Sequence, residues 1–515
     1  MKKLFENWKK DIPSSLVVYF VALPLCLGIA LASTGDASLL FSGIISGVVG
    51  GVVVGSISKA KLGVSGPAAG LITIVAAAIV SIGSYQGFLL AVIFSGILQI
   101  VASYLKAGVI GYYFPSSVIK GMLAAIGITL ILKEIPHVLG YDADFMGDDA
   151  FIQSDHHNTF TELFYALKSL SPGAIIISII SILILLFFDS KAVKQNKVLK
   201  LIPGALIVVV VGIILNQFFR SAVPSYFLKG EHMVSLPIPS SFNEFITFFT
   251  FPDFSYLSNP TVYIVGATIA LVGSLETLLS VEAIDKLDPD KSHTPKNREL
   301  FAQGIGNMVA GFLGGLPITQ VIVRSSANVT SGGKSKLSAI VHGVLLAVTV
   351  ITIPAFLNSI PLASLSSILL LVGYKLAKLD LFKQMYKLGW VQFTPFIITI
   401  LAVLFTDLLK GILIGISIAI LFILKRNYDN AFKRNHIRAE EGKIEIEFPE
   451  QVTFINKGNI INMLNDLPDN SEVVLDGSRC EEMDYDVLEV IQEFKSFGSV
   501  SRNIRLEIKG INDLV

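Results

Sequence analysis

A succession of apolar segments constrains the fold of this chain more than any other feature of its sequence. A helix needs about 20 apolar residues to cross the hydrocarbon layer of a bilayer. Charged residues make up only 16% of the chain, against roughly 25% in ordinary globular domains. The chain is therefore predicted to be an all-α polytopic membrane protein. Its apolar segments lie near residues 14–32, 39–57, 86–106, 114–134, 172–188, 201–217, 261–281, 300–313, 337–357, 362–376, 392–407 and 410–425.

Two further apolar segments, 67–82 and 318–330, are short and begin at clusters of glycine and proline. The first cluster is Gly63-Val64-Ser65-Gly66-Pro67, and the second is Gly314-Gly315-Leu316-Pro317. Counting both predicts about fourteen membrane segments.

The distribution of charge supports this count, because lysine and arginine collect in cytoplasmic loops. With a cytoplasmic N-terminus, every even-numbered segment is followed by a basic loop, and the segment 142–162 holds six acids and no Lys or Arg. This pattern predicts that both termini are cytoplasmic, and it holds only if the two short segments are counted. The basic loops contain Lys59 and Lys61; Lys106; Lys191, Lys194, Lys197 and Lys200; Lys286, Lys291, Lys296 and Arg298; Lys334 and Lys336; and Lys375, Lys378, Lys383 and Lys387.

The spacing of the interruptions indicates an internal duplication. The interval from residue 14 to Pro67 is close to the interval from residue 261 to Pro317. Seven segments per half is an odd number, so the second copy must be inverted in the membrane. Interrupted helices at matching positions of an inverted repeat are a sequence indicator of a transporter's binding site.

A helix that begins inside the membrane leaves its first N–H groups unpaired and directs the positive end of its dipole at them. Two such starts facing each other are expected to bind an anion. Pro317 is expected in the first turn of the second helix, where a missing N–H costs nothing. The alternative is that the glycines and prolines serve only helix packing or a kink. The candidate substrate-binding residues are Gly66, Pro67, Ala68, Ala69, Pro317, Ile318, Thr319, Gln320 and Arg324.

Two charged residues lie deep in the second half. Glu276 is the only charge between Val262 and Val281, and Arg324 follows Pro317 in an apolar or small-residue stretch. Charge at membrane depth is costly and marks a functional site by default. Glu276, with Ser280 one turn later, is predicted to couple proton entry to anion entry. A structural Glu276–Arg324 ion pair is the alternative.

Other classes of protein are excluded. Forty basic and forty acidic residues give no net field for nucleic acid. Cys26 and Cys480 are too few for a disulfide framework or a cysteine metal cluster. His137, His156 and His157 have no metal-ligand spacing. No nucleophile–base pair suggests an enzyme, and no cofactor is expected.

Several separated motifs resemble the sulfate permease (SulP) family of inorganic anion transporters. The resemblance implies fourteen segments in a seven-plus-seven inverted repeat, with a core (segments one to four and eight to eleven) and a gate. It also implies elevator-type alternating access, substrate held between segments three and ten, and a homodimer. The motifs are Ser65-Gly66-Pro67-Ala68-Ala69, Pro115-Ser116-Ser117-Val118-Ile119-Lys120-Gly121 and Asn297-Arg298-Glu299-Leu300-Phe301-Ala302-Gln303-Gly304-Ile305-Gly306-Asn307 through Pro317 to Arg324-Ser325.

Within this resemblance, Glu276 matches the acidic coupling position and Arg324 the family's tenth-segment arginine. Val321, Ile322 and Val323 replace the hydroxyl residues expected of sulfate carriers. Gln320 and Ile322 likewise depart from the small or hydroxyl ligands expected of sodium-linked bicarbonate carriers. The first segment and the stretch around Pro67 look like the bacterial branch associated with carbonic anhydrases, a possible functional partner, which favours bicarbonate slightly.

After Lys425 the composition becomes that of a soluble domain. Strands are predicted at Lys443–Phe448, Val473–Leu475 and Ile504–Ile508, and a helix at Val487–Phe494. This order resembles a short STAS domain, so domains are placed at 1–428 and 436–515. Asp484-Tyr485-Asp486 stands where phosphorylated relatives carry serine, which predicts no such switch. A scaffold or dimer-contact role is preferred to nucleotide binding.

The sequence therefore predicts a secondary transporter of a small inorganic oxyanion, bicarbonate or sulfate, in a bacterial inner membrane. Coupling to H+ is expected, with Na+ as the alternative coupling ion. An uncoupled anion channel or exchanger is a rival, although such a pore gains nothing from a buried carboxylate. A nucleobase–proton symporter is a third hypothesis, but the Gly, Ala and Pro surroundings favour a compact ion.

Overall fold

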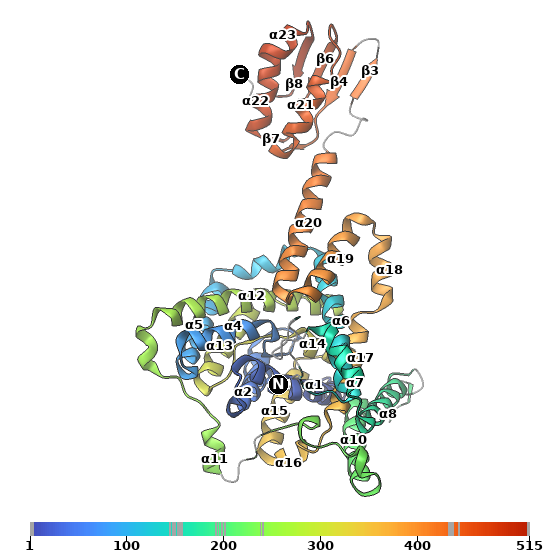
Figure 1. Cartoon of the computed structure of the whole chain (residues 1–515). Coiled ribbons are helices and arrows are strands. Elements are labelled where there is room, and N and C mark those ends of the chain that lie inside the picture. Colours follow the sequence, from blue (N-terminus) through green and yellow to red (C-terminus); the bar gives the residue numbers. More distant parts are fainter. Residues whose placement is uncertain are drawn as a thin grey trace. The chain divides into compact units, whose positions relative to one another are not determined.

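The computed structural model describes residues 5–430, with gaps at 144–145, 147–150, 152–157, 191–192, 194, 197–198, 200–201, 237 and 239–241, and then residues 437–440 and 443–511. The chain forms two compact units, Met1–Ile416 and Ser417–Val515. Figure 1 shows the elements of both.

Within the first unit, one group of helices packs mainly on itself, and we call it the core bundle. Its most extensive contacts join α5 to α13 and α12, and α1 to α15 and α2. The core bundle comprises α1 (Trp8–Thr34), α2 (Leu40–Val49) with its continuation η3 (Gly50–Val54) and α3 (Gly55–Ile57), α4 (Ile72–Ile82), α5 (Tyr85–Tyr104), α12 (Pro260–Leu287), α13 (Lys296–Leu313), α14 (Ile322–Thr330) and α15 (Leu337–Thr352) with α16 (Pro354–Leu357).

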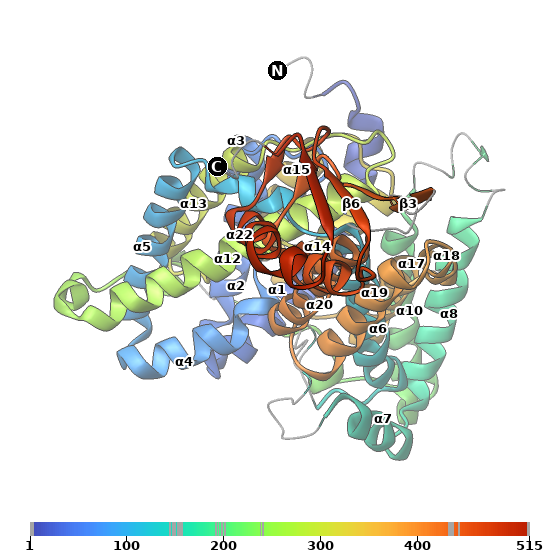
Figure 2. The same cartoon turned by 90° about the horizontal axis from the view of Figure 1, so that it is seen from above.

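A second group, the gate bundle, is organised around α6. This helix packs against α17 and α19, while α8 packs against α10 and α17. Figure 2 shows α6, α8, α10 and α17 on one side of this unit and α4, α5 and α13 on the other. The gate bundle comprises α6 (Ser116–Leu139), α8 (Pro172–Asp189), α10 (Gly204–Ala222), α17 (Leu362–Leu376), α19 (Trp390–Phe405) and α20 (Leu408–Asn430).

Each of the fourteen predicted segments coincides with helical structure, and the two bundles group them as the family resemblance implies. Eight of the described helices are long and apolar enough to cross a membrane. Three shorter apolar helices, Ala69–Ile82, Leu337–Thr352 and Trp390–Phe405, accompany them. The prediction of an all-α polytopic membrane protein is confirmed.

The two interruptions form the strands of a small antiparallel sheet. Strand β1 (Ser65–Pro67) pairs with β2 (Ile318–Gln320), with Gly66 opposite Thr319. A short 3-10 helix, η4 (Ala69–Leu71), leads into α4, and α14 begins at Ile322. The prediction that Pro317 occupies the first turn of the second helix is wrong, because the extended β2 intervenes. Pairing with β1 satisfies this backbone, which would otherwise be buried without partners.

Several shorter elements were not predicted. The acidic segment 142–162 does not stay a loop, since Glu162 lies buried in α7. Its Asp144, Asp148, Asp149, Asp155, His156 and His157 lie outside the described residues. The additional elements include η5 (Ala107–Tyr112), α7 (Thr159–Lys168), η8 (Gly230–His232), α11 (Phe242–Thr247) and the amphipathic α18 (Leu379–Lys387).

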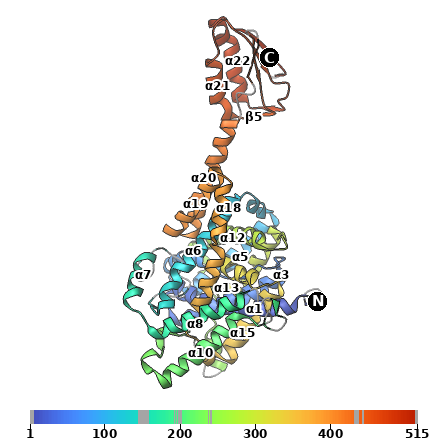
Figure 3. The ribbon, with the colours of Figure 1, turned by 90° about the vertical axis from the view of Figure 1, so that its right-hand side faces the viewer.

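The second unit contains a four-stranded sheet with the order β3-β4-β6-β8. Its core joins Ile446 and Leu475 of the sheet to Ile460 and Ile491 of the helices. Helices α21 and α22 lie side by side (Figure 3). The predicted strands and helix are confirmed. The elements are β3 (Ile437–Glu440), β4 (Lys443–Glu447), β6 (Glu472–Asp476), β8 (Arg505–Lys509), α21 (Lys457–Asn465) and α22 (Tyr485–Glu493), with a small β5–β7 pair (Gln451–Val452 and Glu482–Met483).

Candidate functional site

The crossing of β1 and β2 brings together two parts of the chain that are far apart in sequence. All six strand residues are buried. The Val321 N–H donates to the carbonyl of Val64 at 2.9 Å, which extends the pairing to the start of α14. The crossing therefore holds the beginnings of η4 and α14 close to each other.

One polar face of α13 fixes this crossing. Gln303 Nε2 donates to Ser65 Oγ at 2.7 Å. Asn307 holds Ile318 from both sides, with its Oδ1 accepting from the Ile318 N–H at 2.6 Å and its Nδ2 donating to the Ile318 carbonyl at 3.1 Å. Glu299, four residues before Gln303, accepts from Gln303 Nε2 at 2.9 Å. These three residues belong to a sequence motif that resembles the family, but no role was predicted for them from the sequence. Their spacing by four in an apolar segment was the available signal, because it places them on one helix face.

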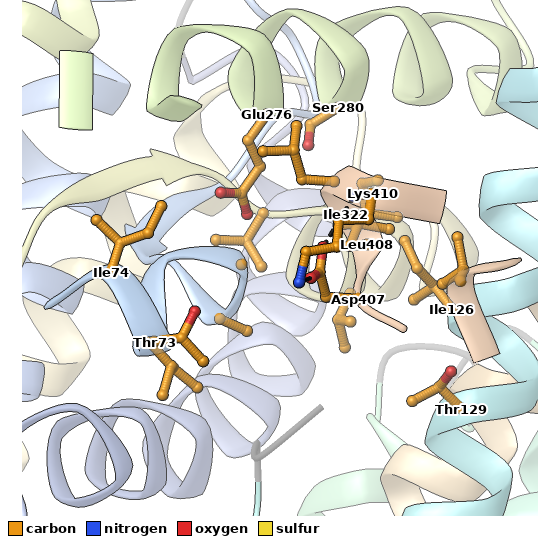
Figure 4. A pocket seen from close by; sticks show the side chains of 17 residues that line it. Thr73, Ile74, Ile126, Thr129, Glu276, Ser280, Ile322, Asp407, Leu408 and Lys410 are labelled. Atoms are coloured by element: carbon orange, nitrogen blue, oxygen red, sulfur yellow. Dashed lines mark hydrogen bonds and ion pairs between the residues drawn. The ribbon is translucent and has the colours of Figure 1, made fainter. Parts of the chain in front are cut away.

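A cavity of about 300 Å³ lies where the two helix starts meet the gate bundle. Figure 4 shows side chains from both bundles around it. The core bundle contributes Ala69, Gly70, Ile72, Thr73, Ile74, Glu276, Ser280, Val321, Ile322 and Val323. The gate bundle contributes Ile126, Thr129, Val403, Asp407, Leu408, Leu409 and Lys410.

Glu276 extends from α12 to the start of η4. A Cβ added to Gly70 would lie 3.1 Å from Glu276 Oε2, so the carboxylate packs against the glycine backbone. Figure 4 shows Glu276 and Ser280 on α12 at the cavity. The partial positive charge at a helix N-terminus stabilises a carboxylate there. Glycine at position 70 is what permits this approach.

Arg324 is fully buried and does not line the cavity. Its guanidinium lies over Gly66, where any Cβ would collide with Nη1. The positive charge also acts on the Cys26 thiol and the His342 ring. Nε, Nη1 and Nη2 are buried and have no carboxylate partner among the described residues, and the Cys26 thiol is their hydrogen-bonding neighbour. Gly66 was predicted to be a substrate-binding residue, but the space beside its backbone is occupied by the guanidinium of Arg324.

The other predicted residues divide between the cavity and the crossing. Ala69 lines the cavity with Gly70, as do Glu276 and Ser280. Thr319 Oγ1 and Gln320 Oε1 are buried and make no hydrogen bond within the described ranges. Gly66, Pro67, Ile318, Thr319 and Gln320 form the crossing, which Ala68 and Pro317 flank, and none of these seven lines the cavity.

The gate-bundle wall was not predicted. Asp407 Oδ1 accepts from the Lys410 backbone N–H at 2.8 Å at the start of α20. Asp407 Oδ2 pairs with Lys410 Nζ at 2.9 Å, and Figure 4 shows this pair beside Leu408 and Ile322. Two charges three residues apart, at the break between two apolar segments, were the available signal.

A separate polar cluster, outside the cavity, surrounds Asp142. His137 Nδ1 donates to Asp142 Oδ1 at 2.6 Å, and His232 Nδ1 donates to Oδ2 at 2.5 Å. Burial alone would raise the pKa of Asp142, but the two histidines lower it overall. The hydrogen bond to Asp142 raises the pKa of His232. Among the described residues no group of three or more His, Cys, Asp and Glu is arranged to hold a metal.

The same arrangement of segments and motifs has known relatives. A sequence profile of the Sulfate permease family matches residues 8–400. The chain belongs to this family. The chain is therefore a multi-pass membrane transporter and not an enzyme.

Two curated relatives cover most of the chain. YvdB of Bacillus subtilis (strain 168), named for sulfate transport, is 26% identical over 428 residues, which is 82% of this chain and 74% of YvdB. The bicarbonate transporter BicA of Picosynechococcus is 25% identical over 437 residues, covering 82% of this chain and 71% of BicA. Among solved structures, murine Slc26a9, an anion transporter in the inward-facing state, superposes with a TM-score of 0.66 at 15% identity and covers 97% of this chain and 85% of that one. At this identity the likeness shows the fold alone.

Proposed function

We propose that this protein is a secondary active transporter of a small inorganic oxyanion, bicarbonate or sulfate. The observation that carries the proposal is the β1–β2 crossing, which leads the starts of η4 and α14 to one cavity. N–H groups at a helix start have no intrahelical acceptors and attract anions. The small residues at the start of the first of these helices, Ala69 and Gly70, leave the backbone N–H groups accessible, which suits a compact ion.

Arg324 supports an anionic substrate. A buried cation without a carboxylate partner is unfavourable unless negative charge approaches it. Arg324 is the third residue of α14, directly behind the cavity-lining Val321, Ile322 and Val323. Its charge would add to the two helix dipoles and raise the local concentration of anions.

Glu276 is proposed to couple transport to protons. Its carboxylate lies at the cavity, against the start of η4, where an arriving anion would repel it electrostatically. Protonation of Glu276 removes this repulsion, so proton and anion enter together. Ser280, one turn along α12, is placed to bind the protonated side chain or the anion. Na+ is the alternative coupling ion, but Gln320 and Ile322 depart from the small or hydroxyl ligands expected of sodium-linked carriers.

Alternating access would follow from the division into two bundles. The core bundle carries both helix starts and Glu276, whereas the gate bundle supplies one wall of the cavity. An elevator movement of the core bundle against the gate bundle would carry the anion across. We further propose a homodimer in a bacterial inner membrane, with both termini cytoplasmic and the α/β unit acting as a STAS-like scaffold.

Transport by purified protein in liposomes tests this proposal. We expect labelled bicarbonate or sulfate to accumulate under an inward proton gradient, with the true substrate identified by competition among bicarbonate, sulfate, fumarate and chloride. Accumulation that depends on a sodium gradient and does not depend on the proton gradient would refute proton coupling. Failure of every oxyanion to enter or compete would refute the substrate class.

A further inference from the structure

The cavity carries three charged side chains, and one of them is a cation from the gate bundle. Glu276 belongs to the core bundle, and Asp407 and Lys410 belong to the start of α20. Arg324, the cation expected from the sequence, does not line the cavity. Among the described residues that line the cavity, Lys410 is therefore the only one with a basic side chain.

The length of α19 indicates that the turn between α19 and α20, which Lys410 follows, lies within the hydrocarbon layer near one of its surfaces. Helix α19 has 16 residues, a rise of about 24 Å, which is shorter than the hydrocarbon layer of about 30 Å. The helix begins at Trp390, next to the basic, amphipathic α18. The turn at Thr406 and Asp407 should therefore end before the opposite membrane surface.

Close packing holds α20 in this position. A Cβ on Gly411 would collide with the backbone of Val403, and a Cβ on Gly415 would collide with Thr399. These contacts fix the two helices against each other next to Lys410. A charged lysine at membrane depth is costly unless it faces water or an ion pathway. The Lys410 side chain is 72% exposed, and it lines the cavity.

The ion pair with Asp407 is suited to exchange. Asp407 also caps α20 through the Lys410 N–H, so its carboxylate stays in place whether or not Nζ is bound. Ion pairs between exposed side chains contribute little stability, so Nζ can leave Asp407 at small cost. An oxyanion in the cavity offers Nζ an equivalent acceptor.

The charges that line the cavity indicate a role for Lys410 in binding an anion. With all three groups ionised, Glu276 and Asp407 outnumber Lys410, and an entering anion meets net negative charge. Protonation of Glu276 makes the lining neutral, and Lys410 can then turn from Asp407 to the anion. We propose that Lys410 is a substrate ligand supplied by the gate bundle, and that Asp407 holds it while the cavity is empty. This inference rests on the proposed oxyanion transport.

Matched variants test the proposal in proteoliposomes. Lys410→Gln should raise the KM for the transported oxyanion about tenfold, the effect of losing one charge-assisted hydrogen bond, with a much smaller change in maximal rate. Lys410→Arg should restore most of the affinity. Asp407→Asn keeps a residue that caps helices equally well and removes the competing charge, so it should lower the KM. Lys383→Gln is the control, because Lys383 forms a comparable i,i+3 pair with Asp380, 75% and 80% exposed, on α18.

The outcomes separate this inference from the proposed function. If wild-type protein transports no oxyanion, the proposed function fails. If it transports one and Lys410→Gln keeps the KM of Lys383→Gln, Lys410 is not a ligand. An equal rise of KM in Lys410→Gln and Asp407→Asn would also overturn the proposal, since it would show that the pair acts only as a structural unit.

Discussion

The first interruption consists of small residues. Charged and amide side chains from the second half of the chain contact these residues. Gly66 faces the guanidinium of Arg324, and Gly70 faces the carboxylate of Glu276. Ser65 receives a hydrogen bond from Gln303. Both interruptions are extended and pair with each other as antiparallel strands. The side chains differ, because the first half supplies the small residues and the second half supplies the polar and charged ones. The inverted repeat therefore supplies a symmetric pair of helix starts, and the second half supplies the two charged side chains that contact the first interruption, Arg324 and Glu276.

The largest combined effect on stability and transport is expected from filling the space at Gly66. Gly66→Ala should lower the free energy of unfolding by about 1–3 kcal/mol, because the new Cβ displaces the Arg324 guanidinium, and it should abolish uptake. Gly273→Ala is the matched control, since its Cβ would make only ordinary contacts, the nearest at 3.5 Å. Thermal unfolding in detergent and uptake in liposomes measure both. Equal behaviour of the two variants would contradict the packing of Arg324 on Gly66.

The next largest effect is expected at the second contact, between Glu276 and Gly70. Glu276→Gln keeps the shape of the side chain and removes its charge, so the proton gradient should no longer drive accumulation. Counterflow of labelled against unlabelled anion should persist. The measurement is uptake with and without a proton gradient. Wild-type accumulation in this variant would favour a purely structural carboxylate.

A substitution at Arg324 tests separately how this residue affects the stability of the fold and the affinity for the anion. Arg324→Met removes a buried cation that lacks a carboxylate partner among the described residues, so stability should be unchanged or higher. Anion affinity should nevertheless fall about tenfold, because the positive potential behind the cavity is lost. Thermal shift and uptake kinetics give the two values. A large loss of stability with unchanged KM would mean that Arg324 serves packing only.

The smallest effect on transport is expected far from both interruptions, at the His232–Asp142 pair. The raised pKa of His232 means that its contribution to stability is complete below the unfolded-state pKa and is lost as pH rises through the folded-state pKa. The lowered pKa of Asp142 means that its contribution is lost only as pH falls through the low folded-state pKa. His232→Asn removes one charged partner of the buried Asp142 carboxylate and leaves His137 in place, so it should cost about 1–3 kcal/mol at neutral pH and change transport least of the four variants, with KM unchanged. Thermal unfolding across pH measures this, and a change of KM would link this cluster to transport.

Much of the fold could be predicted because it depends on local composition. The fourteen segments follow from apolar length and from the sidedness of basic loops, and the α/β unit follows from alternating patterns. The inverted repeat followed from the matched positions of Pro67 and Pro317. The predicted start of the helix after Pro317 was wrong, because a break rich in glycine and proline is compatible with a helix start and with an extended strand.

The candidate site was predicted only in part. Glu276 and Arg324 were recognisable as charges at membrane depth, and Ala69 as part of a helix start. Their partners were not recognisable, because Gly66 and Arg324 are remote in sequence and meet only through the β1–β2 crossing. The polar face of α13 and the Asp407–Lys410 pair were also missed, since amides and ion pairs usually have structural roles.

The sequence by itself determined that this chain must cross a membrane many times, where two of its helices are broken, and that Glu276 and Arg324 are charges at membrane depth. These properties depend on residues close together in the chain. The tertiary structure alone decided that the breaks pair, that Arg324 covers Gly66 instead of lining the cavity, and that the gate bundle places Lys410 opposite Glu276. Each of these depends on contacts between remote segments, whose geometry is set by the packing of whole helices.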